Sequence, residues 1–296
     1  MYRVDNAIIM AAGTSSRFAP LSYENHKSLL TVRGEVLIER QIRQIKEAGI
    51  DNIVLVTGYM KERFAYLKDK FGISLVENTE YGKRNNHSSI YAVRHLLGNS
   101  YICSSDNYFT GNPFECNVED AYYAAVYAHG NTSEWCIYEG EDGYINKVNI
   151  GGQNAWFMMG HVFWNEPFSQ KFVEILEREY DTPEIQNKLW EAIYAEHLDE
   201  LKLRIRHYDD SQIFEFDSLD ELRTFDKSYI DDTRSAIIKQ LAANLGCREA
   251  ELNCFHALKE QDGTQAVGFT FCFGGEVYKY YYKNKEWEKK DGKRYC

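Results

Sequence analysis

The sequence lacks the cysteine spacing of a disulfide-bonded or zinc-binding protein. Its 296 residues contain seven cysteines, an odd number, and no two of them form a CxxC pair. Zinc sites and redox motifs need paired spacing, and secreted disulfide frameworks usually have an even count. The cysteines therefore predict reduced thiols in a cytosolic protein.

Long apolar runs are also missing. The N-terminal segment MYRVDNAIIMAAGTSSRF has a short apolar stretch without a basic flank, and it leads into a Gly/Ser turn. A signal peptide has a longer apolar region behind a basic one. No stretch approaches the roughly 20 apolar residues of a membrane span. We expect no signal peptide, no membrane partner and a cytoplasmic location.

Basic residues are outnumbered by acidic ones. Lys and Arg total 34 against 45 Asp and Glu, which gives a formal net charge of -11. Such a surface repels nucleic-acid backbones and disfavours a general DNA or RNA binder. A small anionic substrate remains compatible, because a local basic pocket can outweigh the global field.

Short apolar strands alternate with amphipathic helices in the first hundred residues. This alternation predicts an α/β fold, with a Rossmann-like mixed, mostly parallel sheet flanked by helices. Polar residues just after Ala11, Glu77 or Ser105 would then lie at the ligand-binding edge. The expected strands are Ala7–Ala11, Asn52–Thr57, Ser74–Glu77 and Tyr101–Ser105, and the expected helices are Val36–Ala48, Lys61–Phe71 and Ser88–Leu97.

The pattern changes after residue 120 and again near Ile230. Further strands are expected at Tyr122–Ala128, Trp135–Glu139, Ile145–Ile150, Trp156–Trp164, Leu203–Tyr208 and Ile213–Phe216, and helices at Phe168–Tyr180, Glu184–Leu201 and from Ser218 to Phe225. Beyond these come a helix at Thr233–Leu245, ended by Gly246, and a Tyr-rich hairpin with a Gly-Gly turn. We predict a main domain at 1–229 and a small α+β C-terminal extension at 230–296, whose role as a dimerisation arm or a lid stays open.

A small-residue loop follows the first strand. Its backbone N–H groups can wrap a polyphosphate, and Arg17 and Lys27 can add positive charge. The alternatives are an ordinary βα turn and a solvated surface lysine. The loop matches neither GxGxxG nor Walker A. The loop residues predicted to bind the phosphates are Ala11, Ala12, Gly13, Thr14, Ser15 and Ser16.

Three carboxylates are candidate metal ligands. Asp106 follows a predicted strand, and Glu215 and Asp217 flank Phe216 in another. A two-residue side-chain period places Glu215 and Asp217 on one face, where two hard oxygen ligands suit Mg²⁺. The alternative is the polar face of an edge strand, with Asp217 or Ser218 capping the next helix.

Polar and aromatic residues are candidates for recognising the two substrates. Asn85 and Asn86, before a helix start that we expect Ser88 to cap, have the amides needed to bind a base edge. Ser88 is a nucleotide-binding candidate together with them, and a polar loop is the alternative. Trp135, Trp190 and, more weakly, Trp156 can surround a quaternary ammonium by cation–π attraction, with Glu191 as counter-charge. Each tryptophan can equally be core, as we expect for Trp164.

The loop and lysine segments together resemble a known family. AAGTSSRF followed by NHKSLL is similar to the pattern of nucleotidyltransferases that activate sugar phosphates and phosphocholine, and the Asn-His-Lys version resembles the bacterial CTP:phosphocholine cytidylyltransferases. The resemblance continues through GYMKERFAYLKDKFG, NNHSSIY, SSDNY, SEW and FEFDSLDEL, in order over roughly residues 5–229. The second glycine of the loop is Ser15 here. Either Ser15 takes a backbone conformation that a non-glycine residue tolerates, or the loop has a slightly different shape.

The resemblance implies a Mg²⁺-dependent nucleotidyltransferase at residues 1–229. It implies metal-binding acids at Asp106, Glu215 and Asp217, and cytosine recognition around the glycine loop and Asn85-Asn86. We assign Lys27 to the α-phosphate and Arg17 to the β/γ-phosphates. The histidines need no proton-transfer role, and His26 orders its loop. The sequence alone does not separate CTP from UTP.

The expected reaction joins CTP to phosphocholine, and a homodimer is compatible with it. Phosphoethanolamine or 2-aminoethylphosphonate is the alternative acceptor if the aromatic cage is incomplete, since a primary ammonium prefers carboxylates. A sugar-1-phosphate nucleotidyltransferase and a catalytically dead nucleotide-binding regulatory module are the remaining alternatives.

Overall fold

The computed structural model describes residues 1–259 and 266–290. Residues 260–265 and 291–296 of the predicted extension lie outside this part. The chain forms two compact units: a larger unit of residues 1–13 and 37–215, and a smaller unit of residues 14–36 and 216 onward. Each unit is therefore built from separate stretches of sequence. The predicted functional division at residues 229 and 230 stays a prediction.

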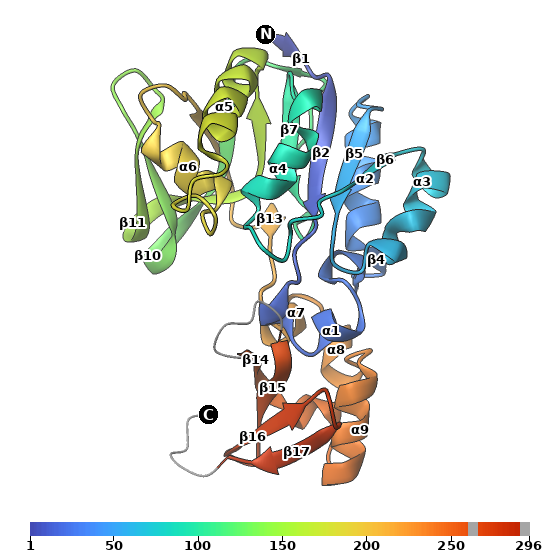
Figure 1. Ribbon diagram of the computed structural model, residues 1–296. Helices are drawn as coiled ribbons and strands as arrows, with labels where there is room; N and C mark the ends of the chain where they lie inside the picture. The colour runs from blue at the N-terminus through green and yellow to red at the C-terminus, as the bar shows by residue number, and fades with distance from the viewer. Residues whose placement is uncertain (260–265, 291–296) are drawn as a thin grey trace. The chain divides into compact units, whose positions relative to one another are not determined.

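A seven-stranded mixed sheet is the centre of the larger unit (Figure 1). The order across it is β12 (Arg204–Tyr208), β10 (Tyr122–Glu139), β11 (Ile145–Trp164), β7 (Ser100–Ser104), β2 (Asn6–Ala11), β5 (Ile53–Thr57) and β6 (Ser74–Glu77). Four of the six neighbouring pairs are parallel, and only β11 pairs antiparallel with its two neighbours. The predicted mixed, mostly parallel sheet is confirmed.

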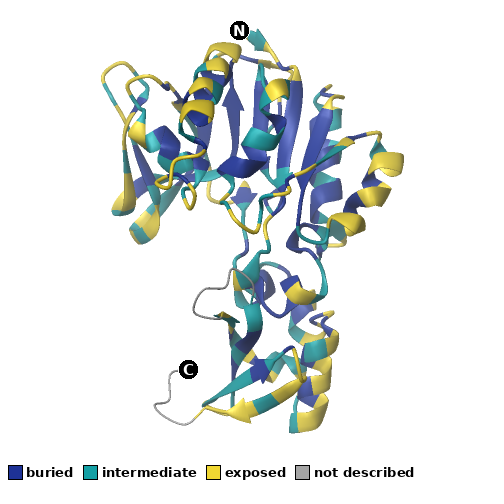
Figure 2. Ribbon diagram, in the orientation of Figure 1, coloured by how far each residue is buried: buried dark blue, intermediate teal, exposed yellow. Residues whose placement is uncertain are grey.

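Helices cover the sheet because their apolar side chains repeat at helical spacing. Side chains of α4 (His87–Val93), α5 (Glu166–Glu179) and α6 (Trp190–Glu196) share one buried cluster with the sheet. Helix α2 (Leu37–Glu47) buries Leu37, Ile38, Gln41, Ile42 and Ile45, which are not part of that cluster. Figure 2 shows the burial concentrated in β2, β5 and β7. Helices on both faces are typical of an open α/β sheet.

The larger unit also contains several short elements outside the seven-stranded sheet. They are β1 (Tyr2–Arg3) paired with β9 (Asn117–Val118), β8 (Tyr108–Phe109) paired with β13 (Ile213–Phe214), the 3-10 helices η3 (Lys61–Phe64) and η4 (Arg94–Leu96), and α3 (Ala65–Phe71). No helix among the described residues is long and apolar enough to cross a membrane.

Two predicted segments differ from the structure for identifiable reasons. The four predicted strands between residues 122 and 164 are two long ones, β10 and β11, with bulges at several register shifts. The helix predicted at Glu184–Leu201 is reduced to α6. The Gln186 carbonyl accepts from the Asn85 amide N, and the Asn187 carbonyl accepts from Asn85 Nδ2. Carbonyls used in tertiary hydrogen bonds are not available to the i→i+4 ladder of a helix.

The smaller unit joins an N-terminal segment to the C-terminal extension. The N-terminal segment contains η1 (Ser16–Phe18), α1 (Leu21–Glu24), η2 (Lys27–Leu29) and the hairpin β3 (Thr31–Val32) and β4 (Glu35–Val36). Helices α7 (Leu219–Phe225), α8 (Ser228–Asp231) and α9 (Ala236–Leu245) follow from residue 216, with η5 (Glu249–Glu251) after them. The predicted caps Ser218 and Gly246 are confirmed as the ends of α7 and α9.

A four-stranded antiparallel sheet completes the smaller unit. Its order is β14 (Asn253–Lys259), β15 (Ala266–Phe273), β16 (Glu276–Tyr281) and β17 (Glu286–Lys289). Gly274 and Gly275, with φ of 60° and 78°, form the predicted two-residue turn between β15 and β16. Cys272 on β15 is disulfide-bonded, so the expectation of reduced thiols is wrong there.

Candidate functional site

The first strand ends in a loop that leaves open space. Strand β2 stops at the buried Ala11, and the carbonyl of Ala12 accepts from the Tyr59 amide at 3.0 Å. A side chain at Gly58 would lie 2.8 Å from that same carbonyl oxygen and 2.7 Å from the Tyr81 ring, so this close approach requires glycine. No atom lies within 4 Å of the position that a side chain at Gly13 would take. The predicted phosphate loop therefore has an unobstructed backbone at Gly13.

The loop continues in the smaller unit through the residue that departs from the family pattern. Ser15 has φ 47° and ψ 40°, the left-handed conformation that glycine favours, and it precedes η1. Thr14 and Ser16 lie on either side of Ser15 along the loop and are half-buried. The ring of Phe18 is buried, while the side chain of Arg17 is 75% exposed. Ser15 thus keeps the left-handed backbone conformation that glycine favours, although it is not a glycine.

Two predicted cations meet one predicted carboxylate. Arg17 forms an ion pair with Asp217, and Lys27 Nζ lies 3.6 Å from the other carboxylate oxygen of Asp217. Lys27 is buried, so its charged ammonium group lies in a low-dielectric environment, where an unpaired charge is costly. The structure therefore brings Arg17, Lys27 and Asp217 into a cluster within the smaller unit.

A short-range hydrogen bond orders the turn that carries Lys27. His26 is the N-cap of η2, and its Nδ1 accepts from the Ser28 amide at 3.2 Å. Lys27 is the first residue of that helix. Both His26 and Ser28 are buried. His26 thus shapes the turn that begins with Lys27, and its lack of a proton-transfer role stays a prediction.

Asp106 and Glu215 lie in the larger unit with an asparagine that the sequence analysis missed. Asn107 Nδ2 donates to Glu215 at 3.4 Å, and the pairing of β8 with β13 sets their register. The buried Asn107 Oδ1 has no hydrogen-bond partner. Its position next to Asp106 was the available signal. Carboxylate and amide oxygens at Asp106, Asn107 and Glu215 are the donor chemistry that Mg²⁺ prefers.

The strand argument for Glu215 and Asp217 is wrong. Strand β13 ends at Phe214, so Glu215 and Asp217 lie in the connection to α7 and not on one face of a strand. They also belong to different compact units. Among the described residues, no three Asp, Glu, His or Cys side chains gather as a metal site. The metal set Asp106, Glu215 and Asp217 stays a prediction.

The asparagines use their side chains inside the larger unit. Asn85 Nδ2 donates to the Asn187 carbonyl at 3.0 Å, and Asn85 Oδ1 accepts from the Asn86 amide. Asn86 Oδ1 accepts from the Trp190 amide at 2.7 Å, and its Nδ2 donates to Glu191 at 3.1 Å. These bonds use about half of the hydrogen-bonding capacity of each side-chain amide. Base recognition by Asn85 and Asn86 stays a prediction.

Ser88 does not cap the following helix. Helix α4 begins at His87 after the N-cap Asn86, and no side chain caps it. The buried Ser88 hydroxyl donates to the Asn85 carbonyl at 2.7 Å and accepts from Asn78 Nδ2 at 2.8 Å. The sequence favoured a cap because serine precedes the apolar run, but tertiary hydrogen bonds hold Ser88 one position inside the helix.

Glu191 is an acidic group in an apolar environment. Its two carboxylate oxygens accept from Asn86 Nδ2 at 3.1 Å and from the Tyr123 hydroxyl at 3.3 Å. The surrounding apolar side chains raise the pKa of the Glu191 carboxyl to about 7, an effect that these two hydrogen bonds only partly offset. Glu191 is therefore poised to change charge near neutral pH.

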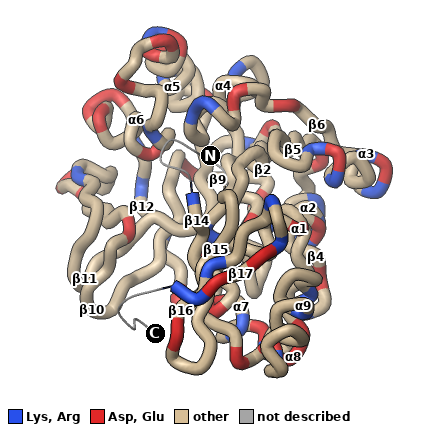
Figure 3. The backbone as a smooth tube through the Cα atoms, turned by 60° about the horizontal axis from the view of Figure 1, so that its bottom comes forward, with Lys and Arg blue, Asp and Glu red and all other residues tan. Residues whose placement is uncertain are grey.

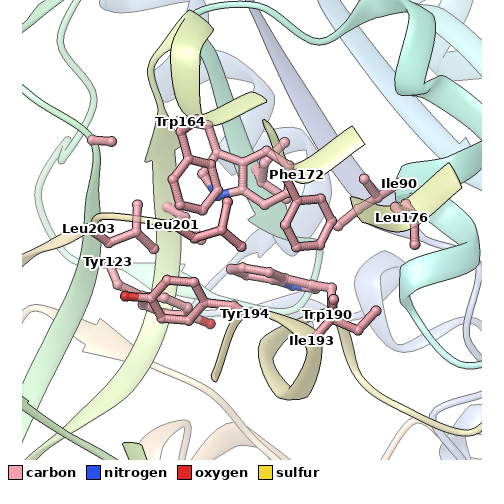
Figure 4. Packing of buried hydrophobic residues seen from close by; sticks show 14 of the residues in the cluster. Ile90, Tyr123, Trp164, Phe172, Leu176, Trp190, Ile193, Tyr194, Leu201 and Leu203 are labelled. Carbon is pink, nitrogen blue, oxygen red and sulfur yellow. The ribbon is translucent and has the colours of Figure 1, made fainter. Parts of the chain in front are cut away.

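The three candidate tryptophans and Trp164 have different environments. Trp190 is 1% exposed, stacks on Tyr123 with ring centroids 5.6 Å apart, and packs with Trp164 and Phe172 (Figure 4). Trp164 is fully buried, as expected for core. Trp135 and Trp156 are only partly buried and pack against the edge of this cluster. Their rings keep accessible surface, whereas that of Trp190 is almost entirely used in packing.

Comparison with known proteins identifies a matching domain family and two related enzymes. Residues 7–109 match the MobA-like NTP transferase domain. The chain is 33% identical over 221 residues to the choline-phosphate cytidylyltransferase of Streptococcus pneumoniae, covering 75% of this chain and 96% of that protein. It is 34% identical over 229 residues to the 2-aminoethylphosphonate cytidylyltransferase of Lancefieldella rimae, covering 76% of this chain and 93% of that protein.

Solved structures show the same fold. The CTP:phosphocholine cytidylyltransferase from Streptococcus pneumoniae superposes with a TM-score of 0.73 at 33% identity, over 77% of this chain and 99% of that one. An inositol-1-phosphate CTP transferase from T. maritima superposes with a TM-score of 0.58 at 15% identity, over 73% of this chain and 91% of that one. The second likeness concerns the fold alone.

Proposed function

This chain belongs to the family of MobA-like NTP transferases, and from that premise we propose that it joins CTP to phosphocholine to give CDP-choline and pyrophosphate. The observation that carries the proposal is the cluster of Arg17, Lys27 and Asp217. It gathers two cations in the segment that follows the open backbone at Gly13 along the chain. Binding of a nucleoside triphosphate requires backbone amides and positive charge close to its phosphates.

The reaction needs positioning more than covalent help. A phosphate oxygen of phosphocholine attacks the α-phosphorus of CTP, the bond from that phosphorus to the bridging α–β oxygen breaks, and pyrophosphate leaves. We assign Lys27 to the growing charge on the α-phosphate and Arg17, with the loop amides, to the leaving pyrophosphate. No general base is needed, because a phosphate monoester is already ionised at pH 7. Catalysis thus depends on geometry and charge neutralisation.

Mg²⁺ is part of the proposal. The oxygen donors suited to it are Asp106, Glu215 and Asp217, with Asn107 as an added candidate, since its Oδ1 is buried and has no partner. The bound metal would offset negative charge on the phosphates of both substrates. The protein's own contribution is to keep these oxygens fixed and to hold the cations Arg17 and Lys27 beside Asp217.

The acceptor pocket is proposed to involve Trp135 and Glu191. Trp135 keeps ring surface for a cation–π contact, and Glu191 supplies a carboxylate. A second candidate acceptor, 2-aminoethylphosphonate, is favoured by the burial of Trp190, because a cage without that ring has more carboxylate than aromatic character. A cytoplasmic location and a homodimer remain predictions. Figure 3 marks acidic positions along the backbone of α5 and α6, and the formal net charge of -11 disfavours a nucleic-acid partner.

The direct test measures pyrophosphate release with Mg²⁺ for CTP, UTP, ATP and GTP against several acceptors. The acceptors are phosphocholine, phosphoethanolamine, 2-aminoethylphosphonate and glucose-1-phosphate. We expect release for CTP with phosphocholine. Release confined to 2-aminoethylphosphonate would reassign the acceptor, and release with glucose-1-phosphate would favour a sugar-phosphate enzyme. CTP binding without any release would support a regulatory module.

A further inference from the structure

The C-terminal extension contacts the segment that carries both catalytic cations. Residues 14–36 share a compact unit with residues 216 onward. The motifs of the family end by about residue 229, so the extension lies beyond the part that resembles the family. The contacts between this segment and the extension lie within one unit and involve side chains on both.

Glu24 caps a helix of the extension. One of its carboxylate oxygens accepts from the Ser235 hydroxyl, and the other accepts from the amides of Ala236 at 2.8 Å and Ile237 at 3.2 Å. These groups begin α9, whose first turn has no acidic residue of its own. Exposed N–H groups and the positive end of the helix dipole favour a carboxylate there. These hydrogen bonds therefore hold the Glu24 carboxylate in place and also stabilise α9.

Thr31 provides a second attachment. Its carbonyl oxygen accepts from the Tyr229 hydroxyl at 2.8 Å and from Arg234 Nη1 at 2.7 Å. Tyr229 is fully buried, and the Arg234 guanidinium lies 4.0 Å from its ring centroid. The Tyr229 hydroxyl and the Arg234 guanidinium thus hold the Thr31 carbonyl, and the burial and packing of Tyr229 restrict the movement of both donors.

Aromatic and backbone contacts extend the same junction. The rings of Tyr23 and Tyr282 stack with centroids 3.7 Å apart and an interplanar angle of 4°. The Arg33 amide donates to Asp226 at 2.7 Å. Helix η1, which contains Arg17, packs against β14 of the extension. Both ends of the cation-bearing segment are therefore attached to residues after 216.

We propose that the C-terminal extension is a positioning element for Lys27 and Arg17. Lys27 lies three residues after Glu24 and four residues before Thr31, so the two attachments bracket it. Their loss would let the lysine move relative to Asp217. Glu24, Tyr229 and Arg234 are positioning residues, because they act through the segment and not on a substrate. This inference rests on the proposed function for the roles of the two cations.

The test compares Glu24→Ala with wild type in the full chain. Hydrogen exchange followed by mass spectrometry should show faster exchange for amides of residues 21–31 and the start of α9, with no change in β5. With CTP and phosphocholine, kcat/KM for CTP should fall about 10- to 100-fold, the range expected for misplacing a catalytic group. The KM for phosphocholine should stay within about two-fold of wild type, and Glu24→Gln should recover part of the loss.

Lys239→Ala is the matched control. Lys239 lies on α9 and pairs with Asp232 at 2.8 Å, so the variant alters the same helix without touching residues 14–36. It should change neither exchange in residues 21–31 nor kcat/KM. If Glu24→Ala is insoluble, Arg234→Ala, which removes the guanidinium of the extension that is bound to the Thr31 carbonyl, is measured in the same way.

The outcomes separate the two claims. Faster exchange with unchanged kinetics would overturn the positioning role, and unchanged exchange in residues 21–31 would overturn the attachment itself. A wild-type protein without CTP turnover would overturn the proposed function and with it the catalytic part of this inference. The exchange data would still decide the attachment.

Discussion

At the scale of single residues, Asp217 balances two different cations. Arg17 is 75% exposed, so its pair with Asp217 stabilises the protein by about 0–1 kcal/mol at most. An incoming triphosphate can therefore draw Arg17 away at low cost. Lys27 is 3% exposed and has lost its hydration, so it depends on nearby negative charge. This asymmetry suits a mobile contact to the leaving group and a fixed contact to the α-phosphate.

Glu191 should make acceptor binding depend on pH. Its pKa of about 7 means that the carboxylate form gains population as pH rises from 6 to 8. A cationic acceptor prefers that form, so the KM for phosphocholine or 2-aminoethylphosphonate should fall by several-fold, up to about ten-fold, over this interval. Steady-state kinetics at fixed, saturating CTP measure the effect.

Glu191→Gln is the control for that dependence. It keeps the size of the side chain and removes the titration. The KM for the acceptor should then be high and nearly independent of pH. The same pH dependence in Glu191→Gln as in wild type would place the titrating group elsewhere.

At the scale of elements, periodicity was informative where burial decides the structure. The strands at β2, β5, β6 and β7 follow from apolar runs between turns, and the structure confirms them. Local pattern was insufficient where distant groups compete for the backbone. Asn85 holds the carbonyls of Gln186 and Asn187, which shortens the helix predicted at Glu184–Leu201. No local signal in residues 184–201 reveals a partner a hundred residues away.

Candidate site residues show the same limit. The cluster of Arg17, Lys27 and Asp217 joins residues that the sequence had selected by residue pattern and by family resemblance. Asn107 was missed although it adjoins Asp106, because its buried oxygen without a partner is seen only in the folded structure. The attachment of residues 14–36 to the extension was likewise beyond the sequence, since Glu24 and Ser235 are 211 positions apart.

Trp135, on β10 of the long hairpin β10–β11, tests the proposed acceptor pocket. Trp135→Ala should raise the KM for phosphocholine about five- to thirty-fold, because a desolvated cation–π contact contributes about 1–2 kcal/mol. The KM for CTP should change less than two-fold. Steady-state kinetics with each substrate varied in turn provide both values.

Ile150→Ala is the matched variant on the partner strand. Ile150 pairs with Trp135 in register and is 72% exposed, so truncating it changes the same region of the hairpin without removing an aromatic ring. It should leave both KM values near wild type. Equal increases in the two KM values for Trp135→Ala would contradict the cage assignment.

At the scale of the whole molecule, the chain passes between its two units three times, between residues 13 and 14, 36 and 37, and 215 and 216. Neither unit is continuous in sequence. The larger unit contains the sheet, Asp106 and Glu215, and the smaller one contains Arg17, Lys27 and Asp217. The predicted phosphate-binding loop passes from one unit to the other at Gly13-Thr14, and the predicted metal ligands are divided between the units at Glu215-Phe216. Each predicted set therefore has members in both units.

Two buried groups, His161 and Glu191, should have opposite effects on how the free energy of unfolding changes with pH. Burial lowers the pKa of His161 to about 3 from 6.5, so its contribution to stability is present above pH 6.5 and is lost as pH falls toward 3. Burial raises the pKa of Glu191 to about 7 from 4.5, so its contribution is largest below pH 4.5 and is lost as pH rises toward 7. Between pH 4.5 and 6.5 the two effects offset each other.

Glu191→Gln should remove one side of that balance. In urea unfolding between pH 5.0 and 6.5, the free energy of unfolding should rise with pH more steeply in the variant than in wild type. The difference in slope should be up to about 1 kcal/mol per pH unit. All other titrating groups are common to both proteins. Equal slopes would show that Glu191 is not protonated in the folded state at pH 5.

The central claim is that this protein transfers the cytidylyl group of CTP to phosphocholine. ³¹P NMR of CTP, phosphocholine and Mg²⁺ with the purified full-length chain tests it most directly, because it identifies which phosphorus forms the new bond. We predict the paired resonances of a pyrophosphate diester together with free pyrophosphate, and neither with Asp106→Asn or with EDTA. Unchanged CTP and phosphocholine, or CDP with a newly phosphorylated acceptor, would contradict the account.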